Sequence, residues 1–131
     1  MKKAFINRDM EVSFVLPRAK RGWKKYFKTK VTFRFDMLAW LKCCEVNGVE
    51  IWQINELQQE ELLHGVCYGA AVSSCMLEYK RPFFNYDLVR YWLLNVLTNA
   101  QAVEILRVME TSRAFNSPQK VATQEGGDEK K

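Results

Sequence analysis

The stretch from residue 30 to residue 48, KVTFRFDMLAWLKCCEVNG, constrains the fold more than any other part of the sequence. Apolar and polar residues alternate up to Phe35, which is the period of a strand with one buried face. Asp36 follows as the expected N-cap of a helix, because a short carboxylate accepts hydrogen bonds from the free N–H groups of the first turn. Gly48 suits the left-handed conformation that commonly closes a helix. Between these two residues, apolar positions recur at helical intervals and predict one buried stripe containing Met37, Leu38, Trp40, Leu41 and Cys44.

The sequence before this helix predicts a β-hairpin over residues 10–35. Its strands are expected at residues 10–16 and 26–35, since both segments alternate apolar and polar residues and Pro17 ends the first. The connecting loop, around residues 18–25, contains no acidic residue. The inner face of the hairpin is expected to contain Val12, Phe14, Leu16, Phe27, Val31, Phe33 and Phe35.

Residues 36–113 predict a helical body. After the first helix, a short linker whose Trp52 is expected to pack inward leads to a long helix over residues 56–79. Ala70, Ala71 and Ser74 are small, which would let another helix approach this one closely. Two further helices are expected, at 87–97 and 98–112. The expected caps of these three helices are, in order, Asn55 with Gln58, Asn85 or Asp87, and Thr98 with Gln101.

The chain is therefore predicted to be a mainly α (α+β) protein in which a small N-terminal β-hairpin precedes about four helices. Residues 1–115 are expected to form a single globular domain, because 131 residues that are 48% apolar suffice for one core. From residue 116 onward the sequence has no aromatic residue and no apolar period. Residues 116–131 are therefore predicted to be a flexible polar tail.

Positive charge is concentrated at the N-terminal end of the chain. Residues 1–34 hold 11 Lys and Arg against 2 acids, whereas the net charge of the whole chain is +5. In the expected hairpin these charges alternate with aromatic residues, a pattern that can track a phosphate backbone and stack bases. The same charges could dock on an acidic protein or protect an edge strand from unwanted pairing. The basic patch consists of Arg18, Lys20, Arg21, Lys24, Lys25 and Lys28, interleaved with Trp23, Tyr26 and Phe27.

No catalytic, metal-binding or cofactor-binding residue is predicted, so we expect the protein not to be an enzyme. His64 is the only histidine and has no nucleophile or ligand cluster near it, so we expect it at the surface or boundary of a helix. The four cysteines lack CxxC spacing and are expected to be reduced, mostly buried thiols. No apolar run is long enough to cross a bilayer, and Arg8, Asp9 and Glu11 interrupt the N-terminal segment where a signal peptide would need its apolar core. The sequence therefore predicts a cytoplasmic protein without membrane contact.

Aromatic residues are numerous in the expected helical body. A small helical domain has difficulty burying all of them, and the usual solutions are oligomerisation or a groove that binds an apolar partner. We therefore expect a homo-oligomer, or a partner-binding groove built from Trp40, Trp52, Phe83, Phe84, Tyr86 and Trp92.

The order and spacing of these elements resemble the tail assembly chaperones of long-tailed bacteriophages. In that family a strand ending in an aromatic residue leads into a helix with the pattern Asp-x-x-Ala followed by a closing Gly, which is similar to Asp36, Ala39 and Gly48 in this sequence. The resemblance covers about residues 28–113. Its later parts are matched by Tyr68, Gly69 and Ala70, then by Asp87, Leu88 and Val89, and finally by Ser112.

This resemblance implies a non-enzymatic assembly factor acting in the cytoplasm of the host. Such chaperones are small helical proteins that oligomerise, coat the apolar tape measure protein and help to recruit subunits of the tail tube protein. The tape measure protein and the tail tube protein are thus the implied partners, bound by helix-in-groove contacts. The alternative is a small basic nucleic-acid-binding or regulatory protein that uses the segment Arg18–Lys30.

Overall fold

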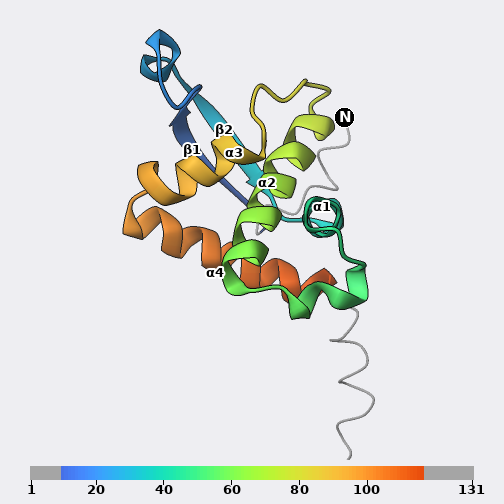
Figure 1. Ribbon diagram of the computed structural model, residues 1–131. Helices are drawn as coiled ribbons and strands as arrows, with labels where there is room; N and C mark the ends of the chain where they lie inside the picture. Colours follow the sequence, from blue (N-terminus) through green and yellow to red (C-terminus); the bar gives the residue numbers. More distant parts are fainter. Residues whose placement is uncertain (1–9, 117–131) are drawn as a thin grey trace, which may run out of the picture.

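The computed structural model describes residues 10–116, which form a two-stranded antiparallel hairpin followed by a helical body (Figure 1). This architecture confirms the predicted mainly α (α+β) class. The segment predicted to be a polar tail, residues 116–131, lies outside the described residues except for its first member. The elements in order are β1 (Glu11–Pro17), the 3₁₀ helix η3 (Trp23–Tyr26), β2 (Lys28–Arg34), α1 (Met37–Asn47), the 3₁₀ helix η4 (Ile51–Glu56), α2 (Gln59–Leu77), α3 (Tyr86–Tyr91), the π-helical turn η5 (Trp92–Val96) and α4 (Asn99–Asn116).

β1 and β2 pair in one continuous register, from Glu11 opposite Arg34 to Pro17 opposite Lys28. Within this ladder the predicted alternation is confirmed, because the side chains on one face of β2 are buried against the helices. The buried members of the predicted inner face are Leu16, Val31, Phe33 and Phe35.

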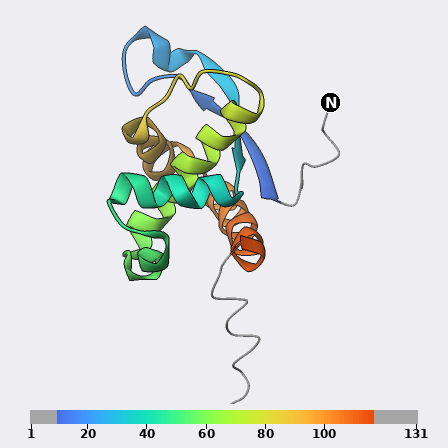
Figure 2. The same ribbon diagram turned by 90° about the vertical axis from the view of Figure 1, so that its right-hand side faces the viewer.

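Phe27 departs from the predicted inner face, since its side chain is 51% exposed. It follows η3 and lies beyond the last pair of the strand ladder. Figures 1 and 2 show this end of the hairpin projecting away from the helices. Alternation predicts which side chains share a face, but the helical body does not reach the end of the face on which Phe27 lies.

Three of the predicted helix N-caps and the predicted C-cap Gly48 are confirmed. The Asp36 carboxylate accepts a hydrogen bond from the N–H three residues later at 3.1 Å, and Gly48 closes α1 with a φ of 67°. The Asn85 side chain caps α3 in the same way, with an N···O distance of 2.9 Å. Before α4, the Thr98 N–H donates to Gln101 Oε1 at 2.9 Å, and the Gln101 N–H donates to Thr98 Oγ1 at 3.2 Å.

The buried stripe of α1 is rotated from its predicted position. Met37 and Leu41 were expected inside but are 39% and 47% exposed. The helix turns its small residues toward α2, which crosses it closely (Figure 1). Its buried side chains are Ala39, Trp40, Cys43 and Cys44.

Two glycines of α2 make the close crossing with α1 possible. A Cβ atom at Gly69 would lie 2.9 Å from Ala39 Cα and closer still to the Ala39 carbonyl oxygen, while a Cβ atom at Gly65 would lie 2.7 Å from Cys43 Sγ. Both positions therefore exclude a side chain. The sequence signal is GVCYG, with glycines one helical turn apart. The close approach of α1 is therefore at Gly65 and Gly69, just before Ala70 and Ala71, where we expected a neighbouring helix to approach.

The linker and the start of α2 also differ from expectation. Trp52 is 73% exposed, because the linker folds as η4 and turns this ring outward. Asn55 lies inside η4, so α2 begins three residues later than predicted. Its capping contact joins the next pair of polar residues, in which the Gln58 N–H donates to Glu61 Oε1 at 3.1 Å.

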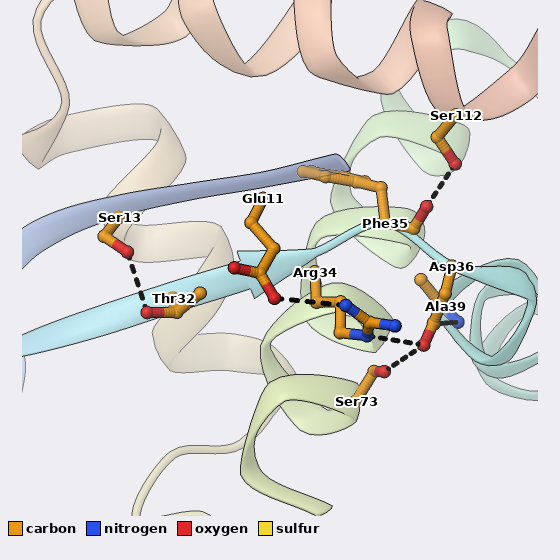
Figure 3. A network of polar contacts seen from close by, with 9 residues as sticks. All are labelled: Glu11, Ser13, Thr32, Arg34, Phe35, Asp36, Ala39, Ser73 and Ser112. Carbon is orange, nitrogen blue, oxygen red and sulfur yellow. Dashed lines mark hydrogen bonds and ion pairs between the residues drawn. The ribbon is translucent and has the colours of Figure 1, made fainter. Parts of the chain in front are cut away.

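A polar clamp joins the hairpin to α1 and α2 (Figure 3). The Arg34 guanidinium contacts Glu11 Oε2 at 3.1 Å and Asp36 Oδ2 at 3.2 Å. The Ser73 hydroxyl of α2 donates to the same Asp36 oxygen at 2.7 Å. Asp36 therefore caps a helix, pairs with the strand before it and bonds to the helix that crosses it.

Two buried hydrogen-bonding groups tie the C-terminal helices to the hairpin. Ser112 of α4 donates to the Phe35 carbonyl oxygen and accepts from Trp40 Nε1 at 3.0 Å. Trp92, which is fully buried, donates from its indole N–H to the Pro17 carbonyl oxygen at 2.8 Å. The core thus lies between the hairpin and the helices, and its large side chains carry their own polar anchors.

Candidate functional site

We call residues 18–28, the connection between the strands together with the first residue of β2, the hairpin tip. Gly22 has a φ of 84°, a left-handed conformation that suits glycine, and it begins the turn of η3. The Lys25 N–H donates to the Gly22 carbonyl oxygen at 3.2 Å, and the Arg18 N–H donates to the Phe27 carbonyl oxygen at 2.9 Å. The backbone of the hairpin tip is therefore hydrogen-bonded, so that its side chains are presented from an ordered turn.

Three aromatic side chains of the hairpin tip are exposed to solvent. Trp23 is 65% exposed and Tyr26 is 75% exposed, in addition to the half-exposed ring of Phe27. The rings of Trp23 and Phe27 meet edge to face with their centroids 5.0 Å apart. Exposed apolar side chains gathered in one place are typical of contact surfaces.

All six residues of the predicted basic patch are exposed and lie in the hairpin tip. None of them forms an ion pair with an acidic residue in the part of the chain from 10 to 116. Lys24 Nζ lies 5.8 Å from the Trp23 ring centroid, and Lys25 Nζ lies 5.2 Å from that of Tyr26. In the helical body, by contrast, three cations pair with glutamates: Lys42 with Glu45, Lys80 with Glu78, and Arg107 with Glu104.

The six aromatic residues that were predicted to bind a partner lie mostly inside the protein. Phe83 and Tyr86 are half-buried: the Phe83 ring packs on Phe84 and Trp92, with centroids 5.3 and 6.0 Å away, and the Tyr86 ring packs on Tyr68 at 5.8 Å. Trp52 alone among the six is exposed. The hairpin and the helices together cover the remaining rings, which are therefore not available to a partner: Trp40, Phe84 and Trp92.

A cationic pocket of about 370 Å³ opens beside the hairpin, between β2, the C-terminal half of α2 and residues 78–84. Sequence reasoning did not find it, because its charged residues come from three separate segments and show no local pattern. Arg18 belongs both to this pocket and to the hairpin tip. The charged residues that line the cationic pocket are Arg18, Lys30, Glu78, Lys80 and Arg81.

His64 and the thiols of Cys43 and Cys67 are buried, and burial shifts their pKa values. His64 is only 3% exposed, so the expected surface position is wrong, and its Nδ1 accepts a hydrogen bond from Arg90 Nε at 3.3 Å. Burial, followed by the nearby Arg90 charge, lowers the pKa of His64. Burial also raises the pKa of the Cys43 thiol to about 12, and it raises the pKa of Cys67. These thiols stay protonated at neutral pH, which makes them poor nucleophiles.

Residues 10–116 contain no group of three or more His, Cys, Asp or Glu side chains that could hold a metal ion. None of the helices formed by these residues combines the length and the apolar character needed to cross a membrane. The four cysteines are free thiols; Cys75 is partly exposed, while Cys43, Cys44 and Cys67 are buried.

The sequence matches no protein-family model, no curated protein and no solved structure. The two candidate sites are the hairpin tip and the cationic pocket.

Proposed function

We propose that this protein is a tail assembly chaperone of a long-tailed bacteriophage, a non-enzymatic factor that binds the tape measure protein and helps to recruit tail tube subunits. The observation that carries the proposal is that the residues matching the family pattern lie at caps and helix contacts of the fold. Asp36 caps α1, Gly48 ends it, and Ala39 lies against Gly69 where α1 and α2 cross. The spacing pattern coincides with contacts that determine the fold, which supports a shared architecture.

The later residues of the pattern support the proposal in the same way. Ala70 of α2 and Val89 of α3 are fully buried in the core. Ser112 is also fully buried and bonds to the Phe35 carbonyl oxygen.

A chaperone for an apolar helical protein needs exposed apolar side chains of its own. The groove expected from the sequence does not supply them, because three of its six rings are buried. The hairpin tip exposes Trp23, Tyr26 and Phe27 instead. We therefore assign the partner contact of the chaperone to the hairpin tip. Oligomerisation, which the resemblance also implies, stays a prediction that light scattering would test.

The proposal is tested by co-purification with the product of a long, tape-measure-like reading frame downstream of the gene. We expect the wild-type chain to retain that protein. The triple substitution Trp23→Ala, Tyr26→Ala and Phe27→Ala should reduce the affinity by about tenfold or more, because exposed aromatic residues are frequent hot spots. Tyr79→Ala is the matched control, since Tyr79 is 98% exposed but lies outside the hairpin tip. The absence of such a reading frame, or no retention by the wild type, would overturn the proposal.

A second candidate function is nucleic-acid binding, and the unpaired cations of the basic patch favour it. Cations next to exposed rings suit a single strand, whose phosphates attract Lys and Arg while its bases stack on aromatic side chains. The test is fluorescence anisotropy with a labelled single-stranded oligonucleotide at increasing salt. Affinity should fall steeply between about 50 and 200 mM salt, and the triple substitution Lys24→Ala, Lys25→Ala and Lys28→Ala should reduce that dependence. An affinity that does not change with salt concentration, or no binding at low salt, argues against nucleic-acid binding.

A further inference from the structure

The cationic pocket has the size and position of a site for a small ligand. Its volume of about 370 Å³ falls within the range of roughly 300–1,000 Å³ that is usual for such sites. Figure 1 shows the segment after α2 returning alongside the hairpin, and the pocket lies between this segment and β2. It shares only Arg18 with the hairpin tip, so it goes beyond the contact proposed for the chaperone.

The charges around the pocket are strongly unbalanced. Glu78 is its one acidic lining residue, and the carboxylate of Glu78 lies 3.0 Å from Lys80 Nζ. This pair is neutral overall. Arg18, Lys30 and Arg81 have no ion pair with an acidic residue within the described range 10–116. Three uncompensated cations around one cavity favour an anion that carries more than a single negative charge.

The other lining groups suit an anion with several acceptor oxygens. Thr29, Thr32 and Ser74 are among the lining residues, and a hydroxyl group can donate one hydrogen bond, although that of Thr32 already bonds to Ser13 at 2.7 Å. The Arg18 guanidinium lies 4.2 Å from the centroid of the Phe83 ring, which holds its planar fork against an aromatic face. An arginine held in this way loses less conformational freedom when it binds a phosphate.

We propose that the cationic pocket binds a phosphate dianion, free or as the monoester group of a nucleotide, held by Arg18, Lys30 and Arg81 and by hydroxyl groups of the lining. A phosphate dianion matches both the charge surplus and the number of donors, whereas one carboxylate would leave most of these donors unused. Burial raises the pKa of the Cys75 thiol in the lining, so this group adds no negative charge to the cavity at neutral pH. The phosphate can come from inorganic phosphate or from a nucleotide.

The proposal is tested by isothermal titration of the full chain at low salt with inorganic phosphate, with AMP and with adenosine. We expect saturable binding of phosphate and of AMP, and none of adenosine. Equal affinities would identify the phosphate group alone as the ligand, while tighter binding of AMP would identify a nucleotide as its source. Adenosine binding as tightly as AMP would overturn the assignment, and so would the absence of saturable binding of both anions.

Two substitutions that each remove one arginine charge distinguish binding in the pocket from general electrostatic attraction of the anion to the protein. Arg81→Gln should weaken AMP binding by about tenfold, since it removes charged hydrogen bonds to the phosphate. Arg21→Gln, on the hairpin tip and outside the pocket, should weaken it by less than about twofold. Equal losses would mean diffuse electrostatic attraction and would overturn the proposal. Because this test contains no protein partner, its failure is independent of the failure of the chaperone proposal. Circular dichroism verifies that both variants are folded.

Discussion

The hairpin tip and the helical body use the same kinds of residue in opposite ways. In the body, Trp92 is fully buried and its indole N–H is bonded to Pro17. In the hairpin tip, Trp23 is mostly exposed and has a lysine beside its ring. Three cations of the body pair with glutamates, whereas those of the tip have no acidic partner between residues 10 and 116. The difference teaches that the buried core and the exposed aromatic surface lie in different parts of the chain, so substitutions should separate stability from the binding that we propose.

The sharpest form of this comparison replaces one tryptophan in each region. Trp92→Ala should lower the free energy of unfolding by about 4 kcal/mol, because it opens a large cavity in the core. Trp23→Ala should change it by no more than about 0.5 kcal/mol. Urea denaturation followed by circular dichroism measures both. If Trp92→Ala does not fold, Trp92→Phe should still cost about 1–2 kcal/mol through the unpaired Pro17 carbonyl group. Similar losses from Trp92→Phe and Trp23→Ala would contradict the comparison.

The next largest effect is expected at the crossing of α1 and α2. Gly69→Ala should destabilise the protein by about 2 kcal/mol, because the new Cβ atom meets the backbone of Ala39. Gly65→Ala should cost less, since the nearest atoms that it meets belong to side chains, Cys43 Sγ and Asn47 Nδ2. Thermal unfolding of the two variants gives the order. The reverse order would mean that α1 can shift away from Gly69.

A buried and an exposed serine sharpen the comparison further. Ser112→Ala should cost about 1–2 kcal/mol, because it leaves the Phe35 carbonyl group and the Trp40 indole without this hydroxyl. Ser13→Ala removes an exposed bond to Thr32 and should cost at most about 0.5 kcal/mol. Chemical denaturation compares the two variants. Equal costs would show that Ser112 does not couple α4 to the hairpin.

The smallest effect concerns pH and is confined to the body. Burial and Arg90 lower the pKa of His64 from its ordinary value of 6.5, while Glu60 acts weakly in the other direction. His64 therefore binds a proton more readily in the unfolded chain than in the folded one. The contribution of neutral His64 to the free energy of unfolding is complete above pH 6.5, and it is lost as the pH falls toward the pKa of His64 in the folded protein. His64→Gln keeps an acceptor for Arg90 but does not titrate. Its unfolding free energy should fall less than that of the wild type between about pH 7.5 and 5.5, and an identical slope would contradict the pKa shift.

The parts of the fold that depend on short-range chemistry could be predicted from the sequence. The strand, the cap and the helix of residues 30–48 occur in the predicted order, because Asp36 and Gly48 act within one turn of their own positions. The same holds for Thr98 and Gln101, which bond to each other. Periodicity predicted the wrong buried side chains where burial depended on the position of another element, as at Phe27 and on the rotated stripe of α1.

The candidate sites show the same limit. The basic patch is continuous in sequence, so its charges could be predicted to lie together, and the hairpin tip does bring them together. The predicted aromatic groove failed, because composition alone does not tell how much area a hairpin can cover. The cationic pocket was missed entirely, since Arg18, Lys30 and Arg81 meet only after β2, α2 and the following segment have packed.

The bond between Ser112 and the Phe35 carbonyl group has a consequence for synthesis of the chain. These residues are 77 positions apart, so a nascent chain cannot form this contact until its last helix has been translated. The hairpin leaves the ribosome first, with the apolar faces of Phe33 and Phe35 still uncovered. We therefore expect folding to complete late, and messages truncated before the codon for Ser112 to yield chains that aggregate or are degraded.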